Sequence, residues 1–101
     1  MAEQKRATEE FAQALGQEVD FAFRNLASLI QRDEALSAKD KALIALACSV
    51  AVRCDRCIQR HKETSNNAGA SREEMLEAAA VAGLVRMGSG FNADAALLDE
   101  D

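Results

Sequence analysis

Three side chains capable of redox and proton-transfer chemistry lie within eight residues of one another in this sequence. Cys54 and Cys57 form a C-x-x-C pair, and His61 follows four residues after the second cysteine. Positions three and four apart share a face of an α-helix, so a helix that begins at or just before Cys54 directs all three side chains to one side. A thiolate attacker, a resolving thiol and an imidazole that carries a proton are what dithiol reduction of a peroxide or a disulfide requires.

The residues around the cysteine pair favour the thiolate form. A cysteine at a helix N-terminus lies near unsatisfied amide groups, which lower the pKa of its thiol. The positive charges of Arg53 and Arg56 act in the same direction. Two cysteines separated by two residues also close a disulfide with little rearrangement. The sequence therefore predicts a pair that cycles between dithiol and disulfide.

Two other interpretations of the cysteines remain open. With His61 the pair would supply three ligands for zinc, whereas structural zinc sites have four and typically use two cysteine pairs. The remaining sulfur, Cys48, lies six residues before the pair in an apolar run, where the sequence predicts a small buried side chain. Packing of the pair in a core is the second alternative, although Asp55, Arg56 and Gln59 make its surroundings partly polar. We expect no metal and no cofactor.

Apolar periodicity and the absence of proline predict that helices carry this motif. In the first third of the chain, apolar residues recur at steps of three and four: Phe11, Leu15, Val19, Phe23, Leu26 and Ile30. This spacing predicts one helical face, with Gly16 splitting or bending the helix. Residues 32–36 are predicted to connect it to the next helix.

Two further helices are expected around the motif. A capping box of Ser37 and Asp40 begins the first, which runs to about Arg53. This segment is apolar almost all round after its first turn, so we expect it to be the buried central helix. The next helix carries Cys57 and the histidine, and it ends near Gly69, a residue suited to the left-handed position after a helix.

A last helix is expected to begin at a capping box of Ser71 and Glu74 and to run to about Met87. Residues 88–90, Gly-Ser-Gly, are predicted to end it. No segment of useful length has the period of a strand. The predicted fold class is all-α, a small bundle of about four to six helices.

Length and composition predict a single domain over residues 1–101, with its core in residues 36–88. Hydrophobic residues make up 49% of the chain, but many are alanines and only four are aromatic. Alanine buries little area, and burial stabilises a fold by roughly 25 cal/mol per Å². One chain therefore builds a modest core, and we expect an oligomer in which a second subunit supplies part of it.

Charge and cysteine content argue against several classes of protein. The formal net charge is −5, and Lys and Arg form no phosphate-binding cluster, so we expect neither nucleic acid nor an anionic membrane as partner. The longest apolar run, about residues 42–52, is far shorter than the ~20 residues that span a bilayer. Residues 1–6 lead into no apolar core of a secretory signal. Three cysteines cannot all pair within one chain, which argues against a secreted disulfide framework and favours the cytoplasm.

Residues 36–82 carry a resemblance to a known superfamily. The segment LSAKDKALIALA at residues 36–47 is followed by C-x-x-C-x-x-x-H and then by AGASREE at residues 68–74. This combination resembles the alkylhydroperoxidase D and carboxymuconolactone decarboxylase superfamily. The decarboxylase branch generally lacks the cysteine pair, so the resemblance is to the peroxidase-like side.

The resemblance implies a fold, an assembly and a reaction. The fold would be all-helical, assembled as a homotrimer or homohexamer. Cys57 would attack a hydroperoxide, Cys54 would resolve it to a disulfide, and His61 would belong to a proton relay. An external dithiol donor, a lipoyl or thioredoxin-like protein, would then reduce the disulfide. The activity implied is that of an antioxidant peroxidase.

One position departs from the family pattern. The relay usually includes a glutamate twelve residues before the first cysteine of the motif, and this chain has Ala42 there. Asp40, Glu34 and Glu63 are candidates to replace it, although none occupies the matching position. General acid–base steps contribute roughly 10²- to 10⁴-fold to a rate, so the departure predicts weak peroxidase activity or dithiol–disulfide exchange without a peroxide.

Two further functions on the same scaffold remain open. One is a non-enzymatic redox-sensing or assembly subunit whose disulfide state changes packing or partner binding. The other is a decarboxylase-like enzyme that uses His61 and not the cysteines.

Overall fold

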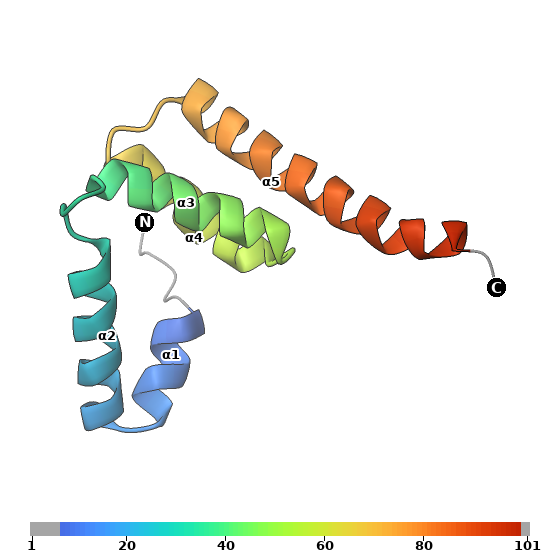
Figure 1. The fold of residues 1–101 in the computed structure, drawn as a ribbon. Helices are drawn as coiled ribbons and strands as arrows, with labels where there is room; N and C mark the ends of the chain where they lie inside the picture. The colour runs from blue at the N-terminus through green and yellow to red at the C-terminus, as the bar shows by residue number, and fades with distance from the viewer. Residues whose placement is uncertain (1–6, 100–101) are drawn as a thin grey trace. The chain divides into compact units, whose positions relative to one another are not determined.

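In the part that its computed structural model describes, residues 7–99, all the regular secondary structure of the chain is helical (Figure 1). The helices are α1 (Ala7–Ala14), α2 (Gln17–Gln31), α3 (Ala38–Ala51), α4 (Asp55–Asn67), α5 (Arg72–Asp94) and the 3-10 helix η1 (Ala95–Leu98). The predicted all-α class is confirmed, because residues 7–99 contain no strand. The segment examined for a secretory signal, residues 1–6, lies outside the described residues. The chain divides into two compact units between Ala38 and Lys39, each described by itself below.

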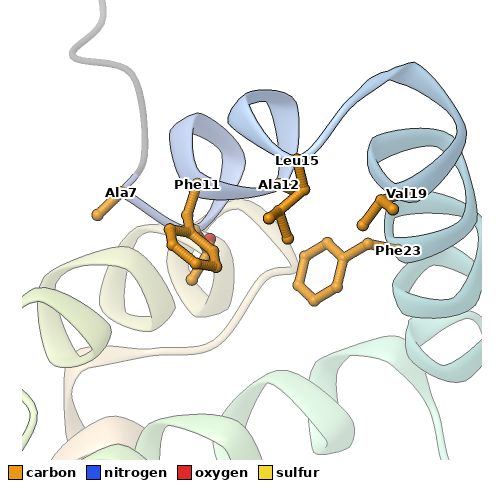
Figure 2. A pocket seen from close by; sticks show the side chains of 7 residues that line it. Ala7, Phe11, Ala12, Leu15, Val19 and Phe23 are labelled. Atoms are coloured by element: carbon orange, nitrogen blue, oxygen red, sulfur yellow. The ribbon is translucent and has the colours of Figure 1, made fainter.

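In the first unit, a glycine splits the predicted N-terminal helix in two. Gly16 has a φ of +117°, a backbone conformation that residues with a Cβ rarely adopt, and it separates α1 from α2. The first four residues of the apolar stripe line a pocket of about 440 Å³, with Phe11 on α1 and Leu15 directly after this helix facing Val19 and Phe23 on α2 (Figure 2). These four side chains remain 42–68% exposed, so the pocket is open to solvent.

At the boundary between the two units, α3 begins at a capped N-terminus. The amide of Ala38, its first residue, donates to the carboxylate of Asp33 at 2.7 Å. A side-chain acceptor at this position satisfies one of the amides that a helix leaves unpaired at its start.

The α3 helix, expected to be the buried central helix, is buried along one face only. Only Ala42, Leu46 and Ser49 are buried, and their spacing of four and three defines one face. Ile44 is exposed, and so is Cys48, which the sequence analysis placed in the interior. An apolar composition indicates that a helix can be buried, whereas burial itself depends on how many elements cover it.

The α5 helix begins as predicted but ends later. The capping box is present in full: Glu74 N–H donates to Ser71 Oγ at 3.0 Å, and Ser71 N–H donates to Glu74 Oε1 at 2.8 Å. The expected end at Met87 is wrong, because the helix continues to Asp94. Glycine costs a helix interior only about 1 kcal/mol relative to alanine, and no proline follows to remove an amide, so Gly-Ser-Gly does not stop the helix.

The core of the second unit is built mainly from small side chains. α4 packs against α5. The buried residues of this unit are Ala42, Leu46, Ser49, Ser65, Ala70 and Ala82. Small residues allow helix backbones to approach closely, but they bury little apolar area, so this core contributes modest stability.

An ion pair joins the first turns of α3 and α5. Lys39 Nζ lies 2.9 Å from Glu74 Oε2. The hydrogen bond from Lys39 lowers the pKa of Glu74, with a second contribution from the Ser71 amide, and the bond to Glu74 raises the pKa of Lys39. Glu74 therefore stabilises the fold above its unfolded pKa, and this contribution is lost as the pH falls through the lower, folded value. The contribution of Lys39 is lost as the pH rises through its raised value.

We expect Glu74→Gln to flatten the acid limb of the stability curve. Glutamine keeps the acceptor for the Ser71 amide, so the capping box survives while the charge that titrates is removed. Urea midpoints of the wild type should fall between pH ~5 and pH ~3 more steeply than those of the variant. Lys39→Met, which removes the other partner, should behave in the same way. Equal slopes in all three proteins would contradict the assignment.

Candidate functional site

Cys54 and Cys57 are joined by a disulfide at the N-terminus of α4. Their Cα atoms lie 5.1 Å apart, a normal separation for bonded cysteines. Cys54 is the N-cap residue and Cys57 is the third residue of the helix. Both residues are partly exposed.

The sulfur of Cys54 caps α4. The Cys57 N–H donates to Cys54 Sγ at 3.2 Å, in the position that a serine or aspartate oxygen usually occupies at a helix start. An amide that donates to sulfur, together with the positive end of the helix dipole, favours the thiolate once the disulfide is reduced. The predicted placement of the pair at a helix N-terminus is thus confirmed, with Cys54 just outside the helix.

A tight joint between α3 and α4 fixes the position of Cys54 from the other side. The Cys54 N–H donates to Ser49 O at 3.1 Å, and the Arg53 N–H donates to Val50 O at 3.1 Å. These two bonds make a Schellman motif, which closes the C-terminus of α3. Arg53 occupies the left-handed position of that motif, with a φ of +58°. Cys54 therefore ends one helix and begins the next.

His61 lies on the same side of α4 as Cys57, one turn further along. Both residues are partly buried. Ser65 follows after another four residues, is fully buried, and its Oγ has no hydrogen-bond partner in the described part of the chain. A stripe of polar groups thus runs from the disulfide towards the interior. Ser65 was not predicted to belong to the site, although its spacing of four from the histidine was the available signal.

Residues 17–100 match the family model of the carboxymuconolactone decarboxylase family. This chain belongs to the carboxymuconolactone decarboxylase family. A crystal structure of a protein from Methanobacterium thermoautotrophicum is similar over 92% of this chain and all of that one, with 41% identity and a TM-score of 0.82.

Two further relatives support this membership. A carboxymuconolactone decarboxylase family protein from Thermotoga maritima, for which a role in the antioxidative response has been suggested, is 35% identical over 79% of this chain and 70% of its own, with a TM-score of 0.67. A Paracoccus denitrificans protein known as uncharacterized protein 4 in cox locus is 35% identical over 88 residues, which are 84% of this chain and 79% of that protein.

In this member of the carboxymuconolactone decarboxylase family, the position expected to carry a glutamate is occupied by a buried alanine. Ala42 is 1% exposed on the buried face of α3. Of the three carboxylates considered as replacements, Glu34 pairs with Arg32 at 2.9 Å, and Asp40 and Glu63 are exposed. Across residues 7–99, no three His, Cys, Asp or Glu side chains stand close enough together to hold a metal ion.

The stretch of sequence that contains the disulfide is basic, although the chain as a whole carries a formal net charge of −5. Residues 53–62 contain four basic residues and one acidic residue: Arg53, Arg56, Arg60 and Lys62 against Asp55. Arg53 and Arg56 are exposed, and in the described residues neither guanidinium forms an ion pair. Among residues 7–99, no helix is long and apolar enough to cross a membrane.

Proposed function

We propose that this protein is a thiol-dependent hydroperoxide reductase whose working groups are Cys57, Cys54 and His61. The observation that carries the proposal is an accessible disulfide whose first sulfur caps a helix. A disulfide in this position is one that a helix N-terminus helps to reduce, because the helix stabilises the thiolate that is released. The suggested antioxidative role of the Thermotoga maritima relative supports the same chemistry.

In the proposed cycle, the Cys57 thiolate attacks the terminal oxygen of a hydroperoxide. The O–O bond breaks, the sulfur becomes a sulfenic acid, and the alcohol leaves after taking a proton from the His61 relay. The Cys54 thiolate then attacks the Cys57 sulfur and forms the disulfide, while the S–O bond breaks and the sulfenic hydroxyl leaves as water after taking a proton from solvent. Two electrons pass from the two thiols to the peroxide.

A dithiol carried by a second protein would complete the cycle. We propose a lipoyl or thioredoxin-like donor, because an external dithiol can reduce the pair and become a disulfide itself. The excess of basic residues at positions 53–62 suits a donor with an acidic surface around its thiols. A reducing compartment, the cytoplasm, would supply such a donor.

Assembly of several copies is part of the proposal. Among the described residues, the buried apolar set is four alanines and Leu46, whereas nineteen large apolar residues are exposed. On α5 alone, six are 53–67% exposed: Leu76, Val81, Leu84, Val85, Met87 and Phe91. Exposed apolar surface of this extent is typical of a protein–protein interface, so we propose that copies of this chain cover one another. The family resemblance implies that the assembly is a homotrimer or homohexamer. Light scattering should give three or six times 10.9 kDa, and a monomer would contradict the proposal.

A second function is favoured by one observation, the absence of a carboxylate at Ala42. Without it, proton delivery to a peroxide is slower, while thiol–disulfide exchange needs no such relay. The alternative is therefore a disulfide reductase that uses the same two cysteines.

Thiol labelling before and after one equivalent of cumene hydroperoxide tests the proposal. The reduced protein should lose two labelled thiols, mapped to Cys54 and Cys57, and regain them with a dithiol. Because Cys48 is exposed and free, the experiment is repeated with Cys48→Ser, which should give the same two-thiol loss. If both thiols stay labelled with peroxide but react with disulfides, the second function holds and the first is wrong.

A further inference from the structure

The turn between α3 and α4, directly before the disulfide, places a non-glycine residue in a backbone conformation that is unfavourable for residues with a Cβ. Arg53, with a φ of +58°, is the sole non-glycine residue with a positive φ among residues 7–99. In this region the Cβ of an L-residue crowds the following carbonyl oxygen, and glycine is the usual occupant of this position in a Schellman motif.

The chain contains a matched turn that follows the usual rule. At the end of α4, Gly69 has a φ of +93°, its N–H donates to Asn66 O at 3.1 Å, and the Ala70 N–H donates to Ser65 O at 2.9 Å. The two turns thus have the same hydrogen bonds, with glycine in one and arginine in the other. Glycine at position 53 would hold the first turn with less strain, so the turn itself does not explain the arginine.

The location of the arginine suggests the explanation. Arg53 directly precedes Cys54, whose sulfur already accepts the amide of the helix start. Its guanidinium stays charged at all physiological pH values. The other charged or titratable groups near the pair along the chain are Asp55, Arg56, Arg60, His61 and Lys62. Asp55 opposes the positive charges, so an added cation beside Cys54 restores a field that favours a thiolate.

We propose that Arg53 is kept in this strained position to stabilise the Cys54 thiolate, which makes Cys54 the leaving sulfur when a dithiol reduces the protein. The inference rests on the proposed redox cycle. The donor thiolate attacks Cys57 Sγ, the S–S bond breaks, and its electron pair remains on Cys54. The second donor thiol then attacks the mixed disulfide, releasing Cys57 and leaving the donor oxidised. A thiol with a lower pKa leaves faster, so the charge accelerates this half of the cycle.

Arg53→Gly tests the proposal because the relief of strain should raise the Tm, whereas the loss of the charge should lower the rate of disulfide reduction. The Tm should rise by about 4–8 °C as the left-handed position becomes unstrained. The same substitution should lower the rate of disulfide reduction by dithiothreitol about 2- to 5-fold, because it removes a positive charge from the residue directly before Cys54 in partly exposed surroundings. Arg53→Lys keeps the charge and the strain, and should leave both quantities close to wild type. All variants carry Cys48→Ser, which removes the exposed third thiol.

Two further variants distinguish the effect of a positive charge at position 53 from the effect of the net charge of the protein. Arg53→Gly combined with Gly69→Arg moves the arginine to the matched turn, where an added Cβ meets no atom within 4 Å. This protein keeps the net charge, so it should reduce as slowly as Arg53→Gly without the gain in Tm. In Cys48→Ser/Cys57→Ser, alkylation of the sole remaining thiol measures the Cys54 pKa, which Arg53→Gly should raise by about half a unit to one unit.

A rise in Tm with an unchanged reduction rate and an unchanged alkylation profile would overturn the inference and leave Arg53 a turn residue. Failure of the proposed function gives a different result. In that case no hydroperoxide oxidises the wild-type dithiol, while dithiothreitol reduction still depends on Arg53.

Discussion

Replacing Cys57 by serine is expected to abolish peroxide turnover, and replacing Cys54 is expected to stop the cycle one step later. A serine hydroxyl is not ionised at neutral pH, so Cys57→Ser loses the nucleophile and roughly 10³-fold or more in rate. Cys54→Ser retains the attacking thiolate but lacks the sulfur that resolves it. This variant should consume one equivalent of peroxide and stop as a sulfenic acid.

The two outcomes are distinguished by single-turnover kinetics and by trapping the sulfenic acid with dimedone. Cys54→Ser should give a dimedone adduct on Cys57, and Cys57→Ser should give none. Cys48→Ser serves as the control, because its exposed thiol lies outside the proposed cycle and its loss should leave turnover unchanged. An adduct on Cys54 in the Cys57→Ser protein would reverse the roles of the two sulfurs.

His61→Gln is expected to lower turnover by about 10²- to 10⁴-fold, the usual contribution of a general acid–base group. The histidine lies one helical turn from Cys57 and is partly buried, so it is placed to take the thiol proton and to protonate the leaving alcohol. Glutamine keeps a similar size and a hydrogen-bonding group but carries no titratable proton. The limb of the pH–rate profile near neutrality should therefore disappear.

Gln59→Ala is the matched control for His61→Gln, because Gln59 is an exposed residue on the same helix. It should leave the rate and the pH profile unchanged. The reduction of the disulfide by dithiothreitol should proceed in His61→Gln, which shows that the pair is intact. A variant that keeps its peroxide turnover and pH profile would remove His61 from the mechanism and favour simple exchange between the two cysteines and external thiols.

Local chemistry was enough to predict the parts of this fold that depend on neighbouring residues. The break at Gly16, the end of α4 at Gly69 and the capping box of Ser71 with Glu74 all follow from which side chains tolerate a positive φ or satisfy a free amide. The location of Cys54 and its partner at a helix start follows in the same way.

The features that could not be predicted depend on what surrounds a residue in space. Cys48 lies in an apolar run, yet it is exposed because only one face of α3 is covered. The extension of α5 beyond Met87 reflects the small penalty of glycine in a helix that nothing else terminates. The conformation of Arg53 had no local signal, since the residue that marks such a position is glycine. The replacement of the family glutamate by Ala42 was visible in the sequence, and the structure shows that the position is buried.

Because the Cys54 sulfur caps α4, the stability of the first turn of this helix depends on whether the reduced Cys54 is ionised. Because the Cys57 amide donates to Cys54 Sγ, the free energy by which the helix favours the thiolate equals the free energy by which the thiolate favours the helix. In the reduced protein, protonation of this thiol must loosen the first turn of α4, and deprotonation must tighten it. The ionisation of one sulfur is thereby coupled to the stability of the backbone hydrogen bonds at the start of α4.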